Sequence, residues 1–267
     1  MGSARLVSQA VYGDDDGGAE KPTIEVAAFG TGRNPLSADA LCIYFSTMRE
    51  SSSLRVVLVG LLLSSGIAAA QVEKLESCKP VTDRTGLEGC WILANTPLGR
   101  LPDRPVFWTL DVYPDRVSAQ ASAMPGSTVL SALDRVWLLS VGDKPALPSK
   151  GRRMAQIGPL PIKTNEEYTA QYRESIMKPN AVSRTHLHSG PEIFYTETGE
   201  TCLETPSGKQ VSYQGHNVIV PEGEPMELVA TGLQDRRGLV LVLHSSSKAH
   251  TTLVTDWHST GLCKVQK

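Results

Sequence analysis

The sequence has little net charge and lacks several common functional motifs. Its 26 basic and 28 acidic residues nearly cancel, and its longest basic runs are the arginine pairs at 152–153 and 236–237. It therefore lacks the electrostatic footprint of a nucleic-acid-binding protein. The patterns GxSxG, GxGxxG and GxxxxGK[ST] are absent, which leaves serine hydrolases, dinucleotide-binding proteins and P-loop proteins without support. Histidine is absent before residue 186, so any histidine-based metal site must lie in the C-terminal part.

Two histidines and a glutamate stand close together in residues 186–192, which read His-Leu-His-Ser-Gly-Pro-Glu. On a strand His186 and His188 point to the same face, and Glu192 can fold back toward them. Residues 168–177 favour a strand and residues 178–180 a turn, so a β-scaffold carries the three side chains. Two imidazoles and a carboxylate can hold a divalent transition metal, namely Fe, Mn, Zn, Ni or Cu, and leave coordination positions open.

The spacing around these residues resembles the first motif of the cupin superfamily, G-x5-H-x-H-x(3,4)-E-x6-G. Every interval fits, and Gly199 closes the motif. Asn180 stands at the leading glycine, and asparagine is, after glycine, the residue that best accepts a left-handed turn. The resemblance implies that His186, His188 and Glu192 are three of the four metal ligands that the family uses.

The second cupin motif, G-x5-P-x-G-x2-H-x3-N, fits less completely. Gly215, Pro221 and Gly223 match it, but Met226 stands at the histidine and Ala230 at the asparagine. Met226 then has three interpretations. It is a soft thioether ligand that suits Cu(I), an adaptable apolar side chain in the wall of the cavity, or a sign that the metal site is being lost. We favour the wall, which leaves a three-ligand site with more open positions.

The remaining histidines offer one alternative for the fourth metal ligand. His244, at the end of an apolar strand, is a candidate replacement for the fourth ligand, although we favour the interpretation that it is a polar cap of that strand. His216, His250 and His258 lie beside turns and tail segments, so we expect them to be exposed and assign them no role.

The resemblance implies an all-β fold with a small jelly-roll barrel, or double-stranded β-helix, over about residues 155–257, enclosing a cavity. We place the barrel domain at residues 151–267 and a β-rich N-terminal module at residues 71–150, because residues 107–113 and 129–141 favour strands. Residues 145–153, rich in proline, glycine and basic residues, are the expected linker. The module is either a degenerate cupin half packed beside the barrel or a set of strands and loops that extend and cover it.

Residues 48–70 have the pattern of a secretory signal peptide, with a basic start, an apolar run and Ala-Ala-Ala before Gln71. The apolar run is about a dozen residues, shorter than the roughly 20 that span a bilayer, so we expect no stable membrane span. Residues 1–47 have no sustained hydrophobic period. We interpret them as the product of a start codon placed too far upstream, with a disordered N-terminal extension as the alternative. Export to the periplasm or the extracellular space follows, with a mature start at Gln71.

Four cysteines follow this segment, and none belongs to a C-x-x-C pattern of a zinc or redox site. An even number in an exported chain permits two disulfides, with three pairings. Proximity favours Cys78 with Cys90, and closing that loop stabilises by roughly 3 kcal/mol in the chain-entropy model. Buried free thiols are the alternative.

Two classes of function remain. One is a metal-dependent oxygenase, isomerase or lyase that acts on a small molecule in the barrel, and the other is a small-molecule or metal-binding module without turnover. No catalytic residue can be assigned, and a homodimer stays open. Five side chains are candidates to line a pocket for an anionic ligand, although strand alternation leaves either face open to each: Tyr172, Arg173, Tyr195, Arg236 and Arg237.

Overall fold

A computed structural model describes residues 74–75, 77–143 and 147–263. The expected upstream extension, the signal peptide and the mature start at Gln71 lie outside the described residues. The described residues all belong to one compact unit. No helix in the described part of the chain is long and apolar enough to cross a membrane.

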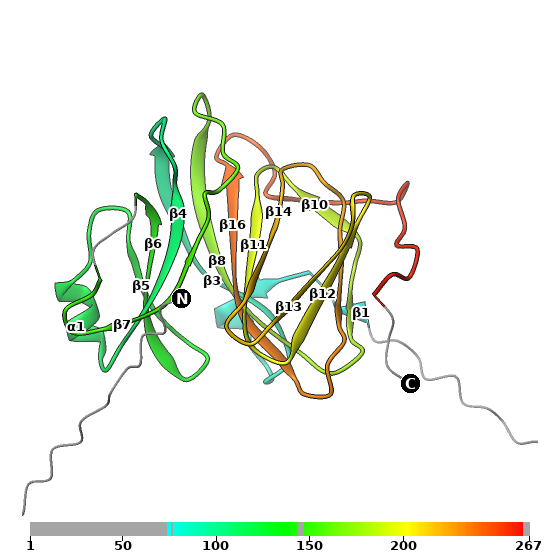
Figure 1. The fold of residues 1–267 in the computed structure, drawn as a ribbon, viewed down its shortest axis with the longest axis horizontal. Helices are drawn as coiled ribbons and strands as arrows, with labels where there is room; N and C mark the ends of the chain where they lie inside the picture. Colours follow the sequence, from blue (N-terminus) through cyan, green and yellow to red (C-terminus); the bar gives the residue numbers. More distant parts are fainter. Residues whose placement is uncertain (1–73, 76, 144–146, 264–267) are drawn as a thin grey trace, which may run out of the picture. The chain divides into compact units, whose positions relative to one another are not determined.

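A barrel is formed by two facing sheets and a closing pair of strands (Figure 1). The six-stranded sheet has the order β14-β11-β16-β8-β3-β2, with strands Asn217–Val220, Glu192–Thr198, Arg236–Ser245, Glu167–Met177, Gly89–Arg100 and Lys79–Pro80. The five-stranded sheet has the order β1-β9-β15-β12-β13, with strands Lys74–Leu75, Val182–Ser183, Glu227–Ala230, Glu200–Thr205 and Gly208–Tyr213. The closing pair is β10 (His186–His188) and β17 (Thr251–Leu253).

A third, four-stranded sheet covers the outside of the barrel. Its order is β5-β6-β4-β7, with strands Thr128–Ala132, Arg135–Gly142, Phe107–Tyr113 and Arg152–Ile157. The only α-helix in the described residues, α1 (Arg116–Ala121), follows β4, and the 3-10 helix η1 (Val81–Asp83) follows β2. The predicted β-region at 129–141 is two strands, because Leu133 and Asp134 both adopt positive φ and form a two-residue hairpin turn.

Strand β16 shows why the six-stranded sheet, which lies between the other two, carries apolar side chains on both faces. Side chains alternate along a strand, so Leu239, Leu241 and Leu243 pack against the four-stranded sheet while Val240 and Val242 face the barrel interior. An uninterrupted apolar run therefore marks a strand that is buried between two layers.

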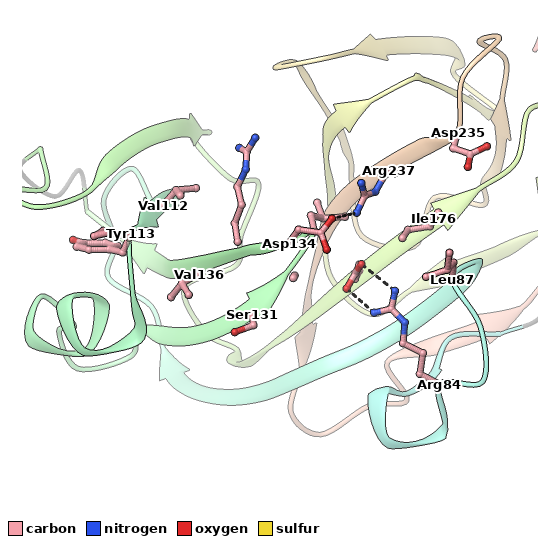
Figure 2. Close-up of a pocket in the computed structure, with 15 residues that line it drawn as sticks. Arg84, Leu87, Val112, Tyr113, Ser131, Asp134, Val136, Ile176, Asp235 and Arg237 are labelled. Atoms are coloured by element: carbon pink, nitrogen blue, oxygen red, sulfur yellow. Dashed lines mark hydrogen bonds and ion pairs between the residues drawn. The ribbon is translucent and has the colours of Figure 1, made fainter.

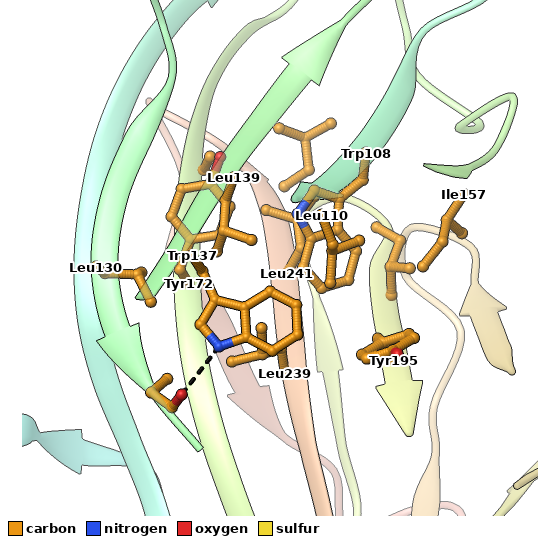
Figure 3. Packing of buried hydrophobic residues seen from close by; sticks show 14 of the residues in the cluster. Trp108, Leu110, Leu130, Trp137, Leu139, Ile157, Tyr172, Tyr195, Leu239 and Leu241 are labelled. Carbon is orange, nitrogen blue, oxygen red and sulfur yellow. Dashed lines mark hydrogen bonds between the residues drawn. The ribbon is translucent and has the colours of Figure 1, made fainter. Parts of the chain in front are cut away.

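Aromatic side chains pack the four-stranded sheet against the barrel. Figure 3 shows Trp108 and Trp137 from the four-stranded sheet packed among Leu239, Leu241 and Tyr195 of the barrel sheet. The Trp137 ring meets the Tyr195 ring edge-on, with 6.2 Å between centroids, and its Nε1–H donates to the Ala132 carbonyl at 2.9 Å. The four-stranded sheet is thus packed against the outer face of the six-stranded sheet.

Strand pairing crosses the boundary expected between residues 150 and 151. Strand β3, from the expected N-terminal module, pairs with β8 of the barrel, and β7, from the expected barrel domain, pairs with β4 of the covering sheet. The expected linker at 145–153 also runs into β7. The reason is that β3 and β7 find hydrogen-bonding partners far along the chain, which linker composition does not encode.

Both ends of the described chain are fastened to the barrel by disulfides. Cys78 is bonded to Cys90 and Cys202 to Cys263, so the pairing favoured by proximity is confirmed. The first disulfide ties the segment between β1 and β2, whose two strands pair with opposite sheets of the barrel. The second ties the C-terminal segment to β12. Two such bonds suit an oxidising compartment.

Candidate metal centre

Local backbone geometry brings the three predicted ligands together. His186 and His188 occupy β10, which pairs with β17, and Glu192 begins β11. Gly190 lies in the turn between them, where a Cβ atom would collide with the Leu243 carbonyl oxygen. A glycine is required at this close approach, because any side chain would push β10 away from β16.

The turns around the site use left-handed backbone conformations. Asn180, Gly199, Gly215 and Gly223 all have positive φ, from 71° to 81°. Such angles cost most side chains free energy but suit glycine and asparagine. Pro221 follows β14 and precedes the turn at Gly223, whose N–H donates to the His188 carbonyl at 2.9 Å.

The ligating atoms converge within the barrel. His188 Nε2 lies 3.2 Å and His186 Nε2 3.8 Å from Glu192 Oε2, and one ligand atom from each residue lies within 4.8 Å of the others. His188 and Glu192 are buried and His186 is half-buried. These atoms are close enough to share one metal ion after small side-chain adjustments.

Hydrogen bonds fix which imidazole nitrogen is free. His186 Nδ1 lies 2.7 Å from the Arg184 carbonyl, and His188 Nδ1 lies 2.5 Å from the His250 carbonyl. A carbonyl can only accept, so each Nδ1 carries a proton, and in the neutral imidazole each Nε2 then presents its lone pair on the side of Glu192. Metal-binding histidines are held in this way by an acceptor behind the ring.

Two atoms at the centre of the cluster lack hydrogen-bond partners. Among the described residues, His188 Nε2 and Glu192 Oε2 are buried without a hydrogen bond. Leaving a buried polar group unsatisfied costs about 1–3 kcal/mol, and more for a charged one. A divalent cation between them would satisfy both, so the residues present fit a metal ion.

Electrostatics keep the ligands in the protonation states that metal binding needs. Burial opposes ionisation of Glu192, but His188, then His186 and Arg173, outweigh it and hold the pKa of Glu192 at about 2. Burial lowers the pKa of His186, against the opposing attraction of Glu192. The two shifts favour a Glu192 carboxylate and a neutral His186 imidazole, which are the metal-binding forms of these groups.

A cavity of about 270 Å³ adjoins the cluster. Arg173 lines it and donates from Nη1 to Glu192 at 3.4 Å, from Nε to Gln171 at 2.7 Å and from Nη2 to Thr251 at 3.3 Å. His250 and Thr251 come from the segment before and within β17. No sequence pattern indicated a role for Gln171, His250 or Thr251. The place of Gln171 depends on the pairing of β8 with β3 and β16, and that of His250 and Thr251 on the pairing of β17 with β10.

Met226 lies directly beside the cluster in the strand register. It forms an antiparallel bridge with His186, with backbone bonds of 2.9 and 3.2 Å in the two directions. Residues directly opposite in such a bridge project from the same face. The Met226 side chain is 1 % exposed and packs in an apolar cluster that includes Phe194 and Leu228.

His244 lies apart from the three-residue cluster. Its Nδ1 is 3.0 Å from the Ser245 carbonyl, and its ring lies 5.7 Å from the His250 ring. Burial lowers the pKa of His244. His216, His250 and His258 are exposed, as expected, but His250 also lines the cavity, so it does have a place near the site.

Of the five side chains considered for an anion pocket, Arg173 alone lines this cavity. Tyr172 and Tyr195 face the covering sheet, because register places them on the outer side of β8 and β11. Arg236 is buried and donates to Thr201 at 2.8 Å. Arg237 instead lines a wider hollow of about 750 Å³ beside the covering sheet, where it pairs with Asp134 (Figure 2).

No protein-family model matches this chain, and no curated protein does. Solved structures match about a third of it. The DMSP lyase DddQ from Ruegeria pomeroyi DSS-3 is 19% identical over 32% of this chain and 43% of its own, with a TM-score of 0.29. A cupin-like protein from Thermotoga maritima MSB8 is 13% identical over 37% of this chain and 74% of its own, with a TM-score of 0.32. A variant of oxalate decarboxylase from B. subtilis is 21% identical over 35% of this chain and 26% of its own, with a TM-score of 0.28.

The matched region spans less than half of the DMSP lyase, and likenesses this distant carry no information about activity. The architecture stands on this chain's own strands and motifs. Two facing, largely antiparallel sheets enclose the first-motif residues His186, His188 and Glu192, and the second-motif segment at 215–226 returns along β10. The chain therefore has the double-sheet β-barrel that its resemblance to the cupins implies.

Proposed function

We propose that this protein binds one divalent transition metal ion through Nε2 of His186, Nε2 of His188 and a carboxylate oxygen of Glu192. The observation that carries the proposal is the pair of buried atoms without partners, His188 Nε2 and Glu192 Oε2. Both would be satisfied by a cation, and both imidazoles are already turned toward that position by the carbonyls behind them.

The protein acts on a small molecule in the cavity next to these ligands. A metal bound there supplies Lewis-acid chemistry or, as iron, the activation of dioxygen. The chain's own residues hold the ligands and shape the space: Arg173 anchors Glu192, while Phe194 and Val240 provide apolar walls that limit water. Oxygenase, isomerase or lyase chemistry fits this arrangement.

Binding without turnover is the second candidate function, and one observation favours it. Among the described residues, Glu192 is the only one with a carboxylate that lines the cavity, and it is needed as a ligand. The buried hydroxyls of Tyr172 and Tyr195 belong to strand positions on the opposite face. Proton transfer by protein groups would therefore fall to His250 or to serine hydroxyls.

Export completes the proposal. The two disulfides form between cysteines that follow the signal-like segment, and such bonds persist in oxidising compartments. We infer that residues 48–70 direct the chain to the periplasm or the extracellular space, where its metal site is loaded.

The test is to purify the protein from the exported fraction and to measure its metals by mass spectrometry, followed by a screen for oxygen consumption. We expect about one equivalent of a divalent transition metal. His216→Ala, at an exposed histidine, is the matched control and should retain the metal. Oxygen uptake or conversion of a candidate substrate would favour the enzyme, and metal content without either would favour the binding protein.

A further inference from the structure

The cavity beside the metal ligands is poor in negative charge. Among the described residues that line it, Glu192 is the only acidic one, whereas Arg173 and Arg184 are both basic. A divalent ion would add two positive charges, Arg173 adds one and Glu192 removes one. A histidine that binds a metal ion does so as neutral imidazole and adds no charge, so the metal-loaded cavity keeps a surplus of positive charge. Charges interact strongly at low dielectric, so such a site favours an anion.

Arg173 is placed to recognise that anion directly. Its side chain is 4 % exposed and lines the cavity. Its three hydrogen bonds to Gln171, Glu192 and Thr251 use three of five N–H donors, and no acceptor within the described residues takes the other two. The bonds also fix the guanidinium plane. A fixed, planar pair of donors matches a carboxylate better than a point charge does.

Much of the remaining wall is apolar, although Ser77, Ser175, Ser183, His250 and Thr251 also line the cavity. Met177, Phe194, Leu228 and Val240 line the cavity from the two facing sheets, and Leu253 lines it from β17. These surfaces give no hydrogen bonds to a highly hydrated inorganic anion, whereas they favour contact with carbon. The volume of about 270 Å³ lies below the roughly 300–1,000 Å³ of pockets for drug-sized ligands.

We propose that the ligand of this cavity is a small organic carboxylate with a compact apolar body, its carboxylate held by Arg173 beside the metal and its body against Phe194, Leu228 and Val240. This inference rests on the proposed metal site. Cationic and neutral polar molecules are disfavoured by the charge, and inorganic anions by the walls.

The test uses protein loaded with Co²⁺, whose bound equivalents are counted first. Benzoate, benzamide and inorganic phosphate are then titrated calorimetrically, because benzamide keeps the ring without the charge and phosphate keeps the charge without the ring. We expect benzoate to bind at least about tenfold more tightly than either. Visible absorption of the bound Co²⁺ should change with benzoate, which reports binding at the metal.

Arg173→Gln should weaken benzoate binding by at least about tenfold, with Co²⁺ still bound. Arg237→Gln removes the same charge outside the cavity and should leave benzoate binding unchanged. If Arg173→Gln fails to fold, the comparison of benzoate with benzamide in the natural protein still tests whether the cavity prefers a carboxylate. Folded protein that takes up no Co²⁺ would overturn the metal site and this inference together. Protein that binds Co²⁺ but treats benzoate and benzamide alike would overturn this inference alone.

Discussion

Substitution of Met226 tests how the barrel uses the position where a cupin has its fourth ligand. The side chain is 1 % exposed and packs in the interior cluster. Met226→Leu conserves apolarity and approximate volume, so the free energy of unfolding should fall by less than about 1.5 kcal/mol. Met226→Ala opens a cavity in the same cluster and should cost about 2–5 kcal/mol. If Met226 is a wall, both variants should keep the metal content and metal identity of the natural protein.

At the same position, Met226→His should strengthen metal binding. Met226 lies directly opposite His186 in the antiparallel bridge, so an imidazole there would project from the same face. It would restore the four-ligand family pattern and should tighten binding of Mn, Fe or Ni, for which imidazole and carboxylate are suitable donors.

Urea denaturation of metal-free and metal-loaded protein measures the stability changes, and competition with a chelator measures metal affinity. The wall assignment would be refuted if Met226→Leu abolished bound copper while unfolding stayed within the stated range. That result would make the thioether a ligand. Weaker metal binding by a well-folded Met226→His would contradict the register argument.

Three further predictions concern the fastened termini and export. Replacing both Cys78 and Cys90 by serine should lower the free energy of unfolding by about 3 kcal/mol. Urea denaturation without reductant measures this change, and an unchanged midpoint would show that the disulfide does not stabilise the fold. Burial opposes ionisation of Glu204, but hydrogen bonds from Thr260 and from nearby backbone N–H groups outweigh it and lower its pKa below 4.5. A lowered folded-state pKa stabilises the protein above the unfolded value, and this stabilisation is lost as the pH falls through the folded-state pKa. Glu204→Gln should therefore cost about 1.5–3 kcal/mol at pH 7 and flatten the acid limb of a stability–pH curve; a parallel acid limb would contradict this. Mass spectrometry of exported protein should find a mature start at Gln71, and peptides from residues 1–47 in it would overturn that interpretation.

The ligand cluster could be predicted because its geometry is local. His186 and His188 share a face through strand alternation, and Glu192 follows one short turn later. The apolar run at 238–243 likewise predicted a buried strand. Asn180 was expected in a left-handed turn and has a φ of 72°.

What surrounds the cluster could not be predicted, because it depends on pairings between distant residues. The acceptor behind His188 is a carbonyl 62 residues away. Arg173 faces the cavity only because β8 pairs with β16 and β3 in a particular register, and a shift of one residue would turn it outward. Composition at residues 145–153 indicated a linker, whereas β7 begins there by pairing with β4.

The most direct test of the central claim is the metal content of a variant that combines His188→Ala with Glu192→Ala. Both side chains are buried at the centre of the cluster, so folding should first be verified by circular dichroism. After equilibration with Mn²⁺, Fe²⁺ or Zn²⁺ and removal of excess metal, the natural protein should retain about one equivalent and the double variant almost none. A folded double variant that still holds a full equivalent would contradict the metal site and leave only the barrel.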